Sequence, residues 1–486
     1  MVKYLQGKRG KRAKKLADRT MGMYKFPSNQ ISVTDFGMPF GMKLDPNNRW
    51  VKKAETIPWG EIELRYAALF KNRKGNVAKP LRMALGALII QTERTISDTE
   101  VPLQIQETPC LQYFCGMPGY EDKLPFDPSL MVYFRKRLTP EILGEINELI
   151  IAKAEKNPEP PPSDPDDTTL PNSGDLIVDA TCAPQNIRYP QDTSLLNEAR
   201  ENLEDMIDEL HDPKVGVKPR TYRKKARKSY LKTTKKRKKT AKEIRNSVKQ
   251  QLQYVRRDLE ITDALLKRGK ALSPWHKERL STIKTLYEQQ LLMFKTRTHK
   301  VDDRIVSLGQ PWVRPIVRGK AKAKCEFGAK LDISVSNGFV RLEHSSFNAY
   351  NESENLIEII ERYRKRTGHY PERVLADQIY RTRDNLKFCK RNGIRLSGKP
   401  LGRPKKDALA DKKLIRKDEI DRVEVERQFS HAKGSFGLGL IRTRLKETSQ
   451  SAITLSILAL NIAHAGRILR ALFRWLVDAP IFMLVQ

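Results

Sequence analysis

The order of short apolar runs and helical patterns after residue 176 constrains the fold of this chain most. A β-rich run at 176–181 is followed by a long charged helical stretch, and strand patterns resume only at residue 325. Strands are then expected at 325–336, 339–347, 373–376 and 394–396, and helices at 354–366, 382–391 and around 419–436. This order predicts an α/β fold with one mixed sheet, interrupted after its first strand by a helical insertion.

The interrupting stretch is strongly basic. Apolar residues recur at three- and four-residue steps from Ile244 to Leu259, and Ser273-Pro274 marks the start of a second helix. The run from Lys214 to Arg245 precedes and enters this helical hairpin. A basic run is often only a solvated segment, but its place between two parts of the sheet favours contact with a DNA backbone. The residues proposed for that contact are Lys224, Lys225, Arg227, Lys235, Lys236, Arg237 and Lys238.

Three acidic residues stand where a purely structural role explains them poorly. Asp179 interrupts the middle of the first strand, where an unpaired carboxylate is costly. Asp377 follows a later strand at its carboxyl end, where α/β sheets place ligand-binding groups. Glu426 lies on a later helix, expected around residues 419–436. Singly, each could be a turn former, a helix cap or half of an ion pair; together they suggest a metal site. Three nearby acids better fit a turn, a strand surface and a helix cap: Asp192, Asp332 and Asp384.

The faces of the helix expected around residues 419–436 follow from residue spacing alone. At about 100° per residue, Arg422, Glu426 and Lys433 fall within about 40° of one another and share one face. This face borders an apolar stripe expected to dock on a core, whereas Glu424 is expected to point towards solvent. The residues of the stripe are Val425, Phe429 and Phe436.

Charge and composition limit the partners. A formal net charge of +34 over 486 residues makes nucleic acid the leading partner, through counterion release. No amphipathic anchor or lipidation signal favours a membrane, and the apolar stretch 452–465 is short for a bilayer span, so a buried helix is expected. The amino terminus is basic without an apolar run, which predicts a protein of the cytoplasm. The five cysteines and seven histidines show no ligand spacing.

Composition also divides the chain into segments. The stretch from Lys156 to Asp175 is rich in Pro, Asp and Ser and is predicted to be a linker. The expected segments are a basic arm and loop-rich segment (1–79), a helical domain (80–155), the linker (156–175), the sheet domain (176–193 and 310–470), the basic helical insertion (194–309) and a C-terminal tail (471–486).

These features together resemble the DDE transposases of bacterial insertion sequences, in particular the fifth insertion-sequence family. Arg422, Glu426 and Lys433 match that family's signature of Arg, three residues, Glu, six residues, Lys, and Glu419 stands where the signature begins with Tyr. Further similarity spans roughly residues 80–470; its segments are LRMALGALIIQT, FDPSLMVYFRKRL, QPWVRPIVRGKAKAKCEFGAK and ADQIY.

The resemblance implies an RNase H-like catalytic domain and a DNA-binding role for the helical domain at 80–155. It implies that Asp179, Asp377 and Glu426 hold two Mg²⁺ ions, replaceable by Mn²⁺, while Arg422 and Lys433 orient Glu426 or touch phosphate. The expected activity is cleavage of double-stranded DNA at transposon ends and joining of the 3′-hydroxyl ends to target DNA. A homodimer assembled on DNA, associated with the bacterial nucleoid, is the expected form.

Two other functions remain open. A metal-dependent RNase H-like nuclease would use the same acids and stop at hydrolysis. A non-catalytic DNA-binding protein derived from a transposase would keep the acids for structural reasons. Intact acids at all three motif positions argue against the second of these.

Overall fold

The computed structural model describes residues 24–26, 32–70, 76–155, 171–214, 216–317, 325–400 and 409–478, without the side chains of 409–411 and 472–478. The predicted basic arm, most of the predicted linker and the end of the predicted C-terminal tail lie outside these residues.

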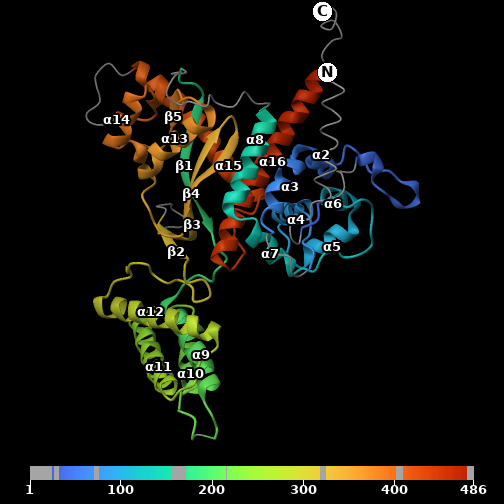
Figure 1. Ribbon diagram of the computed structural model, residues 1–486. Helices are drawn as coiled ribbons and strands as arrows, with labels where there is room; N and C mark the ends of the chain where they lie inside the picture. The colour runs from blue at the N-terminus through green and yellow to red at the C-terminus, as the bar shows by residue number, and fades with distance from the viewer. Residues whose placement is uncertain are drawn as a thin grey trace, which may run out of the picture.

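One mixed sheet forms the centre of the molecule (Figure 1). Its strands are β1 (Asp175–Pro184), β2 (Arg314–Val317), β3 (Cys325–Ser336), β4 (Phe339–Ser346), β5 (Arg373–Leu375) and β6 (Arg395–Leu396). The strands lie in the order β2-β3-β1-β5-β6, and β4 also pairs with β3. Strand β1 is antiparallel to β3 and parallel to β5, and β5 is parallel to β6. The predicted α/β class with a mixed sheet is confirmed.

Local signals placed most of these strands correctly, and one strand was not predicted. Asn337 and Gly338 form the expected tight turn between β3 and β4, both with positive φ (52° and 77°). The unpredicted strand is β2, a short edge strand that contains Pro315 and pairs with the first residues of β3. Proline is tolerated at a sheet edge because no ladder hydrogen bond is lost there, but it removes the usual sequence signal of a strand.

Helices cover both faces of the sheet. On one face lie α13 (Leu356–Thr367) and α14 (Arg383–Arg391), which pack on Leu176 and Val178. On the other lie α15 (Leu409–Ser435) and the first part of α16 (Lys446–Asp478), which pack on Ile177 and Leu375. The alternation of residues along β1 between the two cores follows from the two-residue period of a strand.

The amino-terminal residues form a compact group of helices. They are α2 (Arg49–Thr56), α3 (Trp59–Ala67), α4 (Leu81–Arg94), α5 (Glu100–Glu107), α6 (Pro109–Phe114), α7 (Leu130–Arg137) and α8 (Pro140–Glu155). The expected loop-rich segment up to residue 79 is wrong in part, because α2 and α3 lie within it. Their buried Trp50, Trp59 and Tyr66 supply the apolar area that outweighs the surrounding Gly, Pro and Asn.

Helix α16 joins these amino-terminal helices to the sheet. Leu455, Leu458 and Ile462 belong to the core of α2–α8, whereas Ile453 and Ile457 belong to the core under β1 and β3. The helix is long and apolar enough to cross a membrane, but 452–465 are mostly buried in the protein, as predicted. It continues to Asp478, so the expected C-terminal tail from residue 471 begins as helix.

Four helices lie between β1 and β2 in the chain. They are α9 (Asp192–Leu210), α10 (Arg223–Thr234), α11 (Ala241–Lys267) and α12 (Pro274–Thr296), here called the α9–α12 bundle. Thr240 caps α11 in a capping box, and the Ser273 side chain caps α12 as predicted. Figure 1 shows the bundle projecting from the end of the sheet at which β2 lies.

Candidate active site

Two of the predicted acids belong to neighbouring parallel strands, Asp179 within β1 and Asp377 after the end of β5. Asp179 lies in the middle of β1 between buried Val178 and partly buried Ala180, and its side chain is 21% exposed. Ile177 pairs with Leu375 of β5. The paired residues of β1 and β5 end at this pair; Asp179 lies two residues further along β1, and Asp377 follows two residues after the end of β5.

Asp377 is exposed and also has a local structural role. Its carboxylate accepts a hydrogen bond of 2.7 Å from the backbone N–H of Gln378 and caps a short 3₁₀ helix, Gln378–Tyr380. This is the helix-cap role that the sequence left open. Because the side chain remains exposed, the cap does not prevent contact with a ligand.

Helix α15 lies across these strands. Val425 is completely buried and packs with Phe429 and Phe436 in the sheet core, which confirms the predicted apolar stripe. Arg422 Nη1 lies 3.9 Å from Asp179 Oδ2, so the polar face of the helix borders β1.

The other two predicted residues of this face lie further along α15. Glu426 is exposed one turn after Arg422, and Lys433 is partly buried two turns later. Arg422 therefore contacts one of the predicted acids, Asp179 on the sheet.

The buried hydroxyl of Tyr380 lies near several of these carboxylates. Tyr380 is completely buried, and its hydroxyl has no hydrogen-bond partner among the described residues. Burial raises the pKa of Tyr380, and the negative charges of Asp332, Asp179 and Asp377 raise it further. These three carboxylates therefore act on one buried point behind β1 and β5.

Asp332 was expected on a strand surface, and this expectation is wrong. It is completely buried on β3 opposite Ala180, where the Tyr350 hydroxyl (2.8 Å) and the Asn355 amide (2.6 Å) donate hydrogen bonds to it. Burial raises the pKa of Asp332. The sequence of β3 gave no sign of this, because only the fold reveals that helices cover both faces of the sheet.

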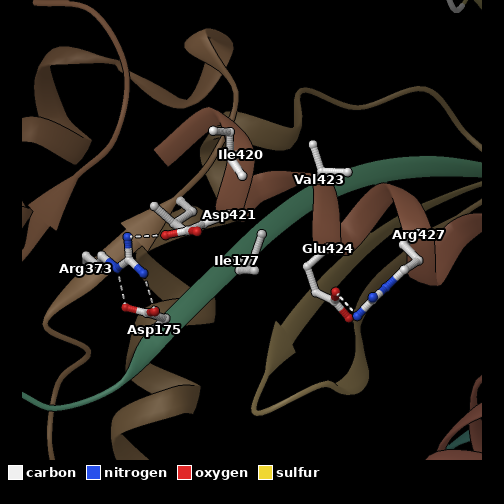
Figure 2. A pocket seen from close by; sticks show the side chains of 9 residues that line it. Asp175, Ile177, Arg373, Ile420, Asp421, Val423, Glu424 and Arg427 are labelled. Atoms are coloured by element: carbon white, nitrogen blue, oxygen red, sulfur yellow. Dashed lines mark hydrogen bonds and ion pairs between the residues drawn. The ribbon is translucent and has the colours of Figure 1, made fainter. Parts of the chain in front are cut away.

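Glu424 was expected to point to solvent, and it does not. Its side chain is 23% exposed, forms an ion pair with Arg427 and accepts a hydrogen bond of 2.5 Å from Gln428. Figure 2 shows Glu424 facing a pocket beside β1 that Ile177 also lines. A helix that lies flat on a sheet shields residues on both flanks of its apolar stripe, so angular position alone overestimated exposure.

The chemistry of the predicted acids fits a hard divalent cation, since carboxylate oxygens are the ligands that Mg²⁺ prefers. Within the described part of the chain, however, no three Asp, Glu, His or Cys side chains lie close enough together to form a metal-ligand cluster. The structure brings Asp179 and Arg422 together, places Asp377 two residues after the end of the adjacent strand β5 and leaves Glu426 one turn further along α15. The assignment of the three acids as ligands stays a prediction.

The predicted DNA-binding cations occupy α10 and the turn that leads to α11. All seven are exposed; they are Lys224, Lys225, Arg227, Lys235, Lys236, Arg237 and Lys238. Lys236 forms an ion pair with Glu243, the residue that completes the capping box of α11. These positive charges are therefore accessible to a large anion.

Comparison with known proteins agrees with this arrangement. The family described as "Transposase DDE domain" matches residues 374–463, a range that contains Asp377 and Glu426. The family described as "Transposase domain (DUF772)" matches residues 39–137, which hold α2 to α7. The latter range begins well before residue 80, where the sequence placed the start of the helical domain.

One relative and one absence complete the comparison. "Uncharacterized protein ORF8 in nfe locus" of Rhizobium meliloti is 27% identical over 161 residues, which cover 33% of this chain and 73% of that protein. No solved structure matches the chain. The two transposase-domain matches support the resemblance to DDE transposases of the insertion-sequence type.

Proposed function

We propose that the protein binds transposon ends, cleaves phosphodiester bonds there and joins the freed 3′-hydroxyl ends to target DNA. The observation that carries the proposal is that Asp179 lies on β1 beside Arg422 of α15, while Asp377 follows the end of the neighbouring parallel strand β5. Asp377 and Glu426 also fall within the range that matches the DDE domain.

We infer that the catalytic domain is RNase H-like. The strand order β4-β3-β1-β5-β6 supports this inference. In this order β3 is antiparallel to both of its neighbours, β4 and β1, whereas β1, β5 and β6 run parallel. In this interpretation the α9–α12 bundle is an insertion after the first strand. The two predicted sheet acids then stand on the central strand and beside it.

The acids and cations of the site have separate roles in the proposal. Asp179, Asp377 and Glu426 would hold two Mg²⁺ ions, or Mn²⁺ in their place; bound ions of this kind activate the attacking oxygen and relieve charge on the phosphate. Arg422, 3.9 Å from Asp179, places a positive charge beside that carboxylate. Lys433 supplies a second positive charge for Glu426 or for a DNA phosphate.

The proposed partner is double-stranded DNA, bound by a homodimer that assembles on the transposon ends in the bacterial cytoplasm, close to the nucleoid. The net charge of +34 supports this partner. The exposed cations of α10 offer phosphate contacts, and the helices of the range matched by the second transposase family offer surfaces that can enter a groove.

The proposal is tested by replacing each acid with its isosteric amide: Asp179→Asn, Asp377→Asn and Glu426→Gln. Each substitution is expected to abolish Mg²⁺-dependent cleavage of the DNA that flanks the coding sequence, because an amide oxygen is a much weaker ligand than a carboxylate. Binding of the same DNA in a gel-shift assay should be unchanged, because the cations that contact phosphate lie elsewhere.

The control is Asp384→Asn. Asp384 is an exposed acid in the first turn of α14, and its replacement should leave cleavage intact. An acid whose amide variant still cleaves DNA is not part of the site. If all three variants retain cleavage, the proposed chemistry is wrong.

A further inference from the structure

A single arginine contacts all three elements that carry the proposed acids. Arg373 is on β5. Its guanidinium donates two hydrogen bonds to the carboxylate of Asp175 on β1 in a bidentate pair, with Nη2 2.6 Å from Oδ2. Its Nη1 also forms an ion pair of 2.7 Å with Asp421 of α15. Figure 2 shows Arg373 between these two carboxylates, one from the strand and one from the helix.

Each contact lies a short distance along the chain from one proposed acid. The pairs are Asp175 with Asp179 on β1, Arg373 with Asp377 after β5, and Asp421 with Glu426 on α15. The spacing is four residues on each of the two strands, which are in parallel register at Asp175 and Arg373. A shift of either strand or of the helix at Arg373 is therefore transmitted to the acid that follows.

A second arginine strengthens the attachment of α15. Arg395 of β6 forms a bidentate pair with Asp418, with hydrogen bonds of 2.6 and 2.8 Å from its guanidinium to the carboxylate. Asp418 Oδ1 also lies 3.3 Å from Arg373 Nη1. Asp418 is only 3% exposed. Two carboxylates on successive turns of α15 are thus held by two neighbouring parallel strands.

Bidentate ion pairs of this kind fix the rotation of α15 on the sheet, which apolar packing alone leaves undetermined. The apolar stripe of α15 attracts the sheet without a preferred direction, and a rotation of the helix by one residue is about 100°. A planar guanidinium that binds a carboxylate through two parallel N–H groups accepts only one relative orientation. The side chain of Arg373 is 17% exposed, so water competes with these contacts only in part.

We infer that Arg373 is a positioning residue of the proposed site: it fixes β1, β5 and α15 relative to one another, and through them the placement of Asp179, Asp377 and Glu426 for binding of divalent cations. This inference rests on the proposed function. Arg373 acts through the backbone of the three elements and not by contact with DNA.

The test measures metal binding directly, without DNA. Full-length wild-type protein and the variants Arg373→Met and Arg373→Lys are titrated with Mn²⁺, and free Mn²⁺ is followed by electron paramagnetic resonance. The ions lost in the Asp179→Asn variant define the site. Arg373→Met is expected to weaken their binding several-fold, less than the about 10- to 100-fold effect of removing a group bonded directly to a ligand, because Arg373 contacts Asp175 and Asp421 and not the proposed ligands. Lys keeps the charge but not the planar geometry, so it should recover only part of the affinity.

A matched control separates positioning from stability. Arg341 of β4 forms a comparable bidentate pair with Glu148 of α8, with hydrogen bonds of 2.9 and 3.0 Å. The side chain of Arg341 is 13% exposed. Arg341→Met removes a guanidinium of similar burial that touches none of the three acid-bearing elements. It should lower the melting temperature without changing Mn²⁺ affinity.

The outcomes distinguish this inference from the proposed function. If wild-type protein shows no Mn²⁺ binding that depends on Asp179, the proposed function fails. If it does, and Arg373→Met melts cooperatively but binds Mn²⁺ like wild type, the positioning role is refuted. Should Arg373→Met not fold, Arg395→Met decides: it keeps Arg373 and is expected to weaken Mn²⁺ binding less but measurably, and unchanged affinity there contradicts the inference.

Discussion

The amino-terminal helices and the α9–α12 bundle are both helical, but they are attached to the sheet in different ways. The core of α2–α8 includes Phe339 of β4 and Leu455 and Leu458 of α16. The main core of the bundle is built from residues between 195 and 308. Cations on the bundle are therefore carried by a body with its own core, whereas the amino-terminal helices share theirs with β4 and α16.

Polar contacts follow the same division. Asn461 of α16 is completely buried and donates to Asn147 of α8 (2.7 Å) and to the carbonyl of Val340 on β4 (2.6 Å). By contrast, the two ends of the bundle meet at a hydrogen bond of 3.4 Å from the Gln310 amide to the carbonyl of Asn186. Figure 1 shows the bundle extending from this junction away from α13 and α14. The difference teaches that a Pro-rich linker does not by itself mark a separable domain.

The largest expected effect is on isolated fragments. A fragment of residues 1–156 seems self-contained from its linker, but the shared core predicts that it will not fold cooperatively, because it loses the apolar face of α16. A fragment of residues 187–311 contains the whole core of the bundle and should fold. Thermal melting followed by circular dichroism compares the two. A cooperative transition for 1–156 would break the comparison.

The next effect concerns DNA affinity. Replacement of Lys224, Lys225 and Arg227 by Gln should flatten the slope of log K against log salt by about 0.9 per lost phosphate contact, with little change in sequence preference. The matched control replaces three exposed cations of α14: Lys387, Lys390 and Arg391. An unchanged slope for the α10 variant would mean that its cations are only solvated.

A smaller effect is expected from two buried amides. Asn461→Leu should lower stability by about 1–3 kcal/mol, because the backbone groups of Val340 and the Asn147 amide lose their partner. Gln251 of α11 is equally buried, but its amide has no hydrogen-bond partner among the described residues, so Gln251→Leu should be neutral or stabilising. If denaturant unfolding shows that Asn461→Leu and Gln251→Leu lower the free energy of unfolding equally, the contacts of Asn461 do not hold the amino-terminal helices to the sheet.

The smallest effect depends on pH. Burial raises the pKa of Glu63 in α3 and of Asp258 in α11 to about 7 in each case. Since the unfolded pKa values are about 4, folding becomes less favourable as pH rises from about 4 to 7 and then changes no further. Glu63→Gln and Asp258→Asn should each raise the melting temperature at pH 8 by a few degrees and have little effect at pH 4. If the bundle melts separately, only Asp258→Asn should shift its transition.

Local signals in the sequence were sufficient for elements that depend on neighbours along the chain. The Asn337-Gly338 turn, the Ser273 cap and the apolar stripe through Val425 are of this kind. The acids at Asp179 and Asp377 could be selected because a carboxylate within or directly after an apolar strand is unusual.

Features that depend on distant partners could not be read from the sequence. Asp332 is buried because helices cover both faces of β3, and Arg373 is noticeable only once Asp175 and Asp421 are seen beside it. Helices α2 and α3 were missed because their packing partners, among them Phe114, come much later in the chain. In each case tertiary contacts outweighed the local pattern.

The most direct test of the central claim is an assay for strand joining. Purified protein is mixed with Mg²⁺, with labelled DNA from the flanks of the coding sequence and with a supercoiled target plasmid. We expect labelled 3′ ends to become covalently joined to the plasmid by wild-type protein and by Asp384→Asn, but not by Glu426→Gln. Cleavage of the flanking DNA without any joined product would contradict the transposase and indicate a nuclease, and binding without cleavage would indicate a non-catalytic DNA-binding protein.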